Sequence, residues 1–183
     1  MKQQLKSYIT ALTIFFIPLF FLPITHEFYN TNKTMLLTVS SLILLSISAI
    51  QFIETKKIEW SKNALLSLRP VLTFLMIISA VTLLRSSNVV QSALDPTLGF
   101  TTLMALTIFY WYIAQEGTKE TKSTHRALFT VGGLFVSVIT IFLSFHPFQN
   151  ASLPQTFVFL KNPGFTPLGN QRDLAIFLGF IVT

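Results

Sequence analysis

The chain has 183 residues, of which 51% are hydrophobic and only 11% are charged, and its mean hydropathy is +0.63. A soluble domain carries about 25% charged residues, so this composition argues against a water-soluble domain. The formal net charge is +6, but the basic residues are dispersed among loops beside apolar segments and do not form the cluster typical of a nucleic-acid surface. We therefore expect an integral membrane protein with no nucleic-acid partner.

The apolar residues come in long blocks, which is the pattern of lipid-facing helices. The first block, residues 8–24, ends without a small-residue cleavage site, so we predict a retained transmembrane helix and not a signal peptide. Pro18 and Pro23 are expected to bend or end this helix. The later blocks lie at residues 35–53, 65–84, 98–114, 127–145 and 174–183.

The last of these blocks is too short to cross a membrane. At the rise of an α-helix it covers about 15 Å, roughly half of a hydrocarbon core about 30 Å thick. We therefore predict an all-α polytopic membrane protein, a single transmembrane domain over residues 1–183 with five full transmembrane helices and an incomplete sixth. Such an ending is typical of the N-terminal part of a longer protein.

The basic residues predict an orientation, because lysine and arginine in short loops stay on the cytoplasmic side. With the N-terminus in the cytoplasm, nine basic residues fall inside and four outside. The inner residues are Lys2, Lys6, Lys56, Lys57, Lys62, Arg69, Lys119, Lys122 and Arg126, and the outer ones are Lys33, Arg85, Lys161 and Arg172. This asymmetry predicts a cytoplasmic N-terminus.

Two outer connections have distinct expectations. Residues 85–97 are predicted to form a hairpin partly buried against the helices, with Asp95 and Pro96 starting the fourth transmembrane helix. Residues 146–173 form a long outer loop with four prolines. Loops of that length are more often functional or disordered than neutral.

No metal or cofactor site is predicted. The chain has no cysteine, and its three histidines, His26, His125 and His146, lie in three separate loops without metal-ligand spacing. Phosphate-binding loops, nucleophile elbows and zinc-protease motifs are also absent from the sequence. Apart from Arg69, the five complete blocks hold no aspartate, glutamate, lysine, arginine or histidine, which argues against an ion-coupled transporter.

The candidate substrate-binding residues are the outer cations Arg172, Lys161 and Arg85. Guanidinium and ammonium groups at a membrane rim suit a phosphate or diphosphate. Arg172 is the strongest candidate, because it follows a turn at the start of a helix whose backbone N–H groups can also contact an anion. Two alternatives stay open: these residues only mark the membrane interface, or Arg172 pairs with Asp173 and caps the helix.

Two stretches, FIPLFFLPITHEFYNTNKTMLL and FTPLGNQRDLAIFLGF, resemble the N-terminal part of bacterial O-antigen ligase and O-antigen polymerase-like proteins. In that family a glycine and an asparagine-containing turn precede a Leu-Ala pair that opens a helix. The matching residues here are Gly169, Asn170, Leu174 and Ala175. The family's usual Pro-Asn before Leu-Ala is replaced in this chain by an Arg-Asp pair.

The resemblance implies a glycosyltransferase of the bacterial inner membrane that moves a saccharide from undecaprenyl diphosphate to a glycan acceptor at the outer face. Its partners would be membrane lipids, the lipid-linked donor and the acceptor, and it would need no cofactor. The family's catalytic residues lie beyond the part that this chain matches, so no catalytic residue is predicted and the fragment is expected to be inactive alone. A lipid or polysaccharide transporter and a non-enzymatic membrane scaffold are the alternatives.

Overall fold

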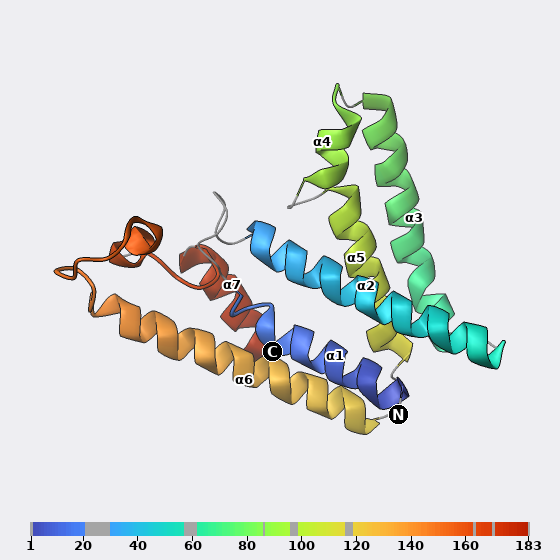
Figure 1. The fold of residues 1–183 in the computed structure, drawn as a ribbon, viewed down its shortest axis with the longest axis horizontal. Coiled ribbons are helices and arrows are strands. Elements are labelled where there is room, and N and C mark those ends of the chain that lie inside the picture. The colour runs from blue at the N-terminus through green and yellow to red at the C-terminus, as the bar shows by residue number, and fades with distance from the viewer. Residues whose placement is uncertain are drawn as a thin grey trace. The chain divides into compact units, whose positions relative to one another are not determined.

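The computed structural model describes residues 2–20, 30–56, 62–85, 87–95, 99–115, 119–162, 164–169 and 171–182. Within these ranges the chain is all-helical, as predicted, with seven α-helices, one 3-10 helix and no strand (Figure 1). The elements in chain order are α1 (Lys2–Phe16), α2 (Asn30–Thr55), α3 (Lys62–Arg85), α4 (Val89–Leu94), α5 (Phe100–Gln115), α6 (Lys119–Ser144), η1 (Gln155–Lys161) and α7 (Gln171–Val182).

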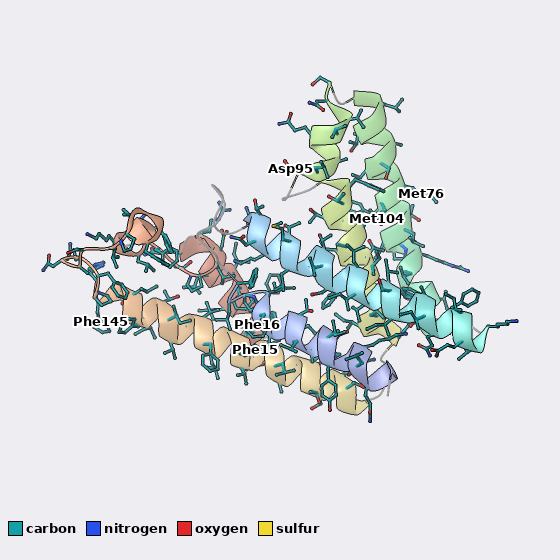
Figure 2. The ribbon with its side chains drawn as sticks, viewed as in Figure 1. Phe15, Phe16, Met76, Asp95, Met104 and Phe145 are labelled. Atoms are coloured by element: carbon teal, nitrogen blue, oxygen red, sulfur yellow. The ribbon has the colours of Figure 1, made fainter. Side chains whose placement is uncertain are left out.

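Two of the described helices are long and apolar enough to cross a membrane, namely α2 and the Thr121–Ser144 part of α6. Only 22% of the apolar stretch of α2 and 17% of that of α6 is buried inside the chain, so neither is the core helix of a soluble domain. Large apolar side chains are exposed along α3 and at the end of α6, including Met76 and Phe145 (Figure 2). Lipid contact would remove such surfaces from water.

The expectation of five full transmembrane helices is not supported by the described residues. Helix α1 ends at Phe16, because Pro18 follows and the residue before a proline disfavours the α conformation. Helix α5 has 16 residues, which cover about 24 Å. Helix α3 is longer, but the apolar stretch found among its described side chains, Leu68–Thr82, has about 15 residues and covers about 22 Å. Residues 21–24, which complete the first predicted helix, lie outside the described residues.

The chain divides into two compact units. The first comprises Met1–Thr13 and Thr34–Lys122, and the second comprises Ile14–Lys33 and Ser123–Thr183. In the first unit α3 packs along α5, and α4 contacts both of these helices. Helix α2 also joins α5 there, because the Ser41 hydroxyl donates a hydrogen bond of 2.9 Å to the carbonyl of Ala105. Leu44 and Phe109 are buried in this unit.

The hairpin expected at residues 85–97 is helical where it is described. Helix α4 does contact its neighbours, but none of its residues is buried. Asp95 follows α4 as its C-cap, and its carbonyl also accepts the Gly99 amide at 2.9 Å and the Thr102 hydroxyl at 3.2 Å, so it contacts the start of α5 as well. The predicted first-turn proline, Pro96, lies outside the described residues.

In the second unit, the glycine pair of α6 allows two other segments to come close. A Cβ atom added to Gly132 would meet the carbonyl oxygen of Phe15 at 3.2 Å, and one added to Gly133 would meet Cδ1 of Ile181 at 2.0 Å. Edge-to-face ring pairs support both contacts, Phe15 with Phe135 at 5.9 Å and Phe129 with Phe177 at 5.3 Å. Helix α6 therefore packs closely against the end of α1 at Gly132 and against the C-terminal half of α7 at Gly133.

Candidate functional site at the start of α7

The turn before α7 is compact and largely buried. Phe165, Thr166 and Pro167 are all buried, and the Gly169 amide donates to the Thr166 carbonyl at 3.0 Å. Gly169 has a φ of 117°, which a residue with a side chain adopts only with strain. The conformation of this turn therefore depends on glycine at position 169, one of the residues on which the resemblance rests.

Lys33 ties this turn to the first turn of α2. Its Nζ donates a hydrogen bond of 3.2 Å to the carbonyl of Pro167, across 134 residues of sequence. The charge of the Asp173 carboxylate also acts on the Lys33 ammonium. Sequence reasoning placed Lys33 only among the outer basic residues, and no local motif could have revealed these partners because they lie so far along the chain.

Arg172 and Lys161 belong to the same unit and are both exposed. Arg172 lies in the first turn of α7, which begins at Gln171, three residues earlier than the predicted apolar block. Lys161 is the last residue of η1. Arg85, the third candidate, ends α3 in the first unit, and its side chain is not among those described. The second unit thus holds two of the three predicted cations, with Lys33 as an addition.

Asp173 occupies the first turn of α7. A carboxylate there is favoured by the N–H groups at the start of the helix. The neighbouring Arg172 is exposed, so its guanidinium is open to solvent at this end of α7.

The described residues contain no group of three or more histidine, cysteine, aspartate or glutamate side chains that could hold a metal ion. His125 is buried on α6 and His146 is exposed just after that helix, with a φ of 52°. His26 lies outside the described ranges. The groups around the start of α7 are the Arg172 guanidinium, the Asp173 carboxylate and the first N–H groups of the helix.

Comparisons with known proteins give this chain no relative. No family model matches it, and neither the curated proteins nor the solved structures include a match. The similarity to O-antigen ligases and polymerases therefore stays a prediction from the stretches that carry it. Arg172, Lys161 and Arg85 likewise stay predicted binding residues.

Proposed function

We propose that this chain is the membrane portion of a glycosyltransferase of the O-antigen ligase or polymerase type, which acts on undecaprenyl-diphosphate-linked saccharides at the outer face of the bacterial inner membrane. The observation that carries the proposal is the exposed guanidinium of Arg172 in the first turn of α7. A guanidinium holds two oxygens of a phosphate at once, and nearby helix N–H groups favour the same anion.

The proposed topology places the N-terminus in the cytoplasm and the loop 146–173 outside. Helices α2 and α6 have the length and apolarity to cross alone. For α3, crossing would require its N-terminal Arg69, which is exposed, to extend its charged end to the membrane interface. Helices α1 and α5 would cross with the residues that adjoin their described ends. In this arrangement α7 begins at the outer interface.

The proposed chemistry is stabilisation of a leaving group. When the bond between the saccharide and the lipid diphosphate breaks, negative charge grows on the diphosphate, and a positioned cation lowers the energy of that state. Arg172 would supply this cation, with Lys161 as an exposed companion in the same unit. The general base for the acceptor hydroxyl is not assigned to any residue of this chain.

A lipid-binding measurement tests the proposal. The full chain in vesicles is titrated with undecaprenyl diphosphate, and Arg172→Ala is expected to weaken binding about tenfold, since a charge-assisted bidentate contact contributes about 1.5–3 kcal/mol. Arg172→Lys should recover only part of the affinity, because a lysine cannot form the bidentate contact.

Arg126→Ala is the matched control, because Arg126 is an exposed arginine of the same unit and lies near the N-terminal end of α6. It should bind as the unchanged chain does. Equal losses in both alanine variants would indicate general charge attraction, and unchanged binding in Arg172→Ala would contradict the proposal.

A further inference from the structure

Helix α4 is a short helix whose polar and apolar residues are cleanly separated. At about 100° per residue, Val89, Val90, Ala93 and Leu94 share an arc of about 140°. Gln91 and Ser92 occupy the opposite side. The three large apolar side chains of this arc are 40%, 68% and 63% exposed at positions 89, 90 and 94. The helix therefore presents an apolar face that the chain itself does not cover.

Polar contacts hold α4 in place without using that face. The Asn88 side chain accepts the Gln91 amide at 3.2 Å and so caps the helix. At the other end, the Thr101 hydroxyl donates to the Ala93 carbonyl at 2.9 Å, which attaches α4 to the first turn of α5. A Cβ atom at Gly99 would meet the Asp95 carbonyl at 2.3 Å, so this close return requires glycine. The orientation of the apolar face is thus fixed by backbone and hydroxyl contacts.

The exposed apolar surface continues from α4 onto the neighbouring helix. Val81 and Leu84, in the last turns of α3, are 54% and 84% exposed, and α4 contacts α3 (Figure 1). The sequence between Arg85 and Asp95 contains no charged residue. Even with Val81 and Leu84 included, five apolar side chains fall short of the roughly 800 Å² per partner that a stable protein interface buries, which disfavours a second copy or a partner protein as the cover.

We propose that α4 lies in the interface of the phospholipid bilayer, with Val89, Val90 and Leu94 against the acyl chains and Gln91 towards water. A neutral amphipathic helix takes this position because its apolar face enters the acyl boundary while its polar face stays hydrated. The position does not depend on the proposed glycosyltransferase activity. In this position α4 would fix how deeply the adjoining ends of α3 and α5 lie in the bilayer.

Spin labelling of the full chain in phosphatidylcholine vesicles tests the position directly. Because the chain has no cysteine, Val90→Cys and Gln91→Cys each give a single labelling site, the first within the apolar arc of α4 and the second about 100° further round, outside it. The label at position 90 should collide with oxygen, which concentrates in lipid, and poorly with a water-soluble nickel chelate. The label at position 91 should show the reverse, and the ratio of the two collision rates should differ at least about tenfold between the sites.

Ile77→Cys provides the deep reference, since Ile77 is an exposed side chain within the apolar part of α3. A label at position 90 should report a shallower depth than the label at position 77. Equal nickel access at positions 90 and 91 would overturn the proposal, as would a depth at position 90 equal to that at position 77. Loss of oxygen access at position 90 as protein density rises would identify a second copy as the cover and would also overturn it.

Discussion

The ammonium group of Lys6 on α1 lies 5.7 Å from the ring centroid of Tyr112 on α5. The same Lys6 Nζ donates to the Gln51 side chain at 2.7 Å. The Tyr112 hydroxyl donates to the Leu44 carbonyl at 3.0 Å and lies 2.5 Å from the Ser48 hydroxyl. Since a phenol has a single hydrogen to donate, Ser48 is the donor in the second bond. Three helices of the first unit thus meet in one polar cluster, formed by Lys6, Ser48, Gln51 and Tyr112.

The hydrogen bonds of this polar cluster predict how loss of the Tyr112 hydroxyl affects stability. Tyr112→Phe keeps the ring under Lys6 but loses the bonds to Leu44 and Ser48, and we expect a loss of about 1–2 kcal/mol in the free energy of unfolding in detergent. Ser48→Ala in the Tyr112→Phe background should then have little further effect, because the two residues share one bond. Strictly additive losses in the double variant would show that the two hydroxyls act separately.

The Lys33 contact predicts that a remote side chain orders the turn before α7. Lys33→Met removes the donor to the Pro167 carbonyl and the cation near Asp173. Backbone amides of residues 164–169 should then exchange with solvent about tenfold faster, since local opening becomes easier. Lys33→Arg should restore part of the protection.

Lys161→Met is the control for net charge, because Lys161 is an exposed lysine of the same unit. Its exchange rates in 164–169 should match those of the unchanged chain. A similar acceleration in both methionine variants would mean that charge, and not the Lys33 hydrogen bond, governs the turn.

The close contacts at Gly132 and Gly133 of α6 predict that alanine substitutions at the glycines of this unit differ in their effect on stability. Gly132→Ala would press a Cβ atom against the Phe15 backbone, which cannot move alone, so thermal unfolding in detergent should show a clear destabilisation of about 1–3 kcal/mol. Gly133→Ala meets only the end of the flexible Ile181 side chain, and its cost should fall when Ile181→Val is added. Gly179→Ala has open space around the new Cβ atom and should be neutral or stabilising by about 0.5–1 kcal/mol. A destabilising Gly179→Ala would show that alanine is unfavourable even where no atom lies close, and the losses at Gly132 and Gly133 could then not be assigned to close contacts.

The proposed topology predicts which single cysteines an impermeant thiol reagent can label. Gln149→Cys, on an exposed position after α6, should label in intact cells. Lys122→Cys, exposed in the first turn of α6, should label only after permeabilisation. The reverse pattern would invert the orientation of α6.

The sequence predicted the class of structure better than the extent of its helices. Block apolarity identified α2 and α6, and Pro18 correctly indicated the early end of α1. The blocks do not resolve where an apolar run stops being helical, so the first block was predicted to run beyond the end of α1 at Phe16, whereas α5 begins and ends within two residues of the predicted block 98–114. Residues 85–97 were expected to form a partly buried hairpin with their apolar pairs against the helices, whereas Val90 and Leu94 are exposed.

At the candidate site, local sequence predicted the position of Arg172 at the start of a helix, which the structure confirms. A turn with Gly169 before that helix is a local feature and could be read from neighbouring residues. The contact between Lys33 and Pro167 depends on how distant segments return to one another. A single sequence contains no physical signal for such a pairing, because any of the outer lysines has the same chemistry.

Two serine hydroxyls of α2 differ in when their hydrogen-bond partners are synthesised. Ser46 bonds to the Leu42 carbonyl of its own helix and is satisfied as soon as α2 forms. Ser41 bonds to Ala105 on a helix synthesised some sixty residues later, a sequence separation of 64, and has no such partner when α2 first enters a bilayer. An unmet hydroxyl in hydrocarbon favours any helix that can satisfy it. The Ser41 hydroxyl therefore lacks its Ala105 partner until α5 has been synthesised and has packed against α2.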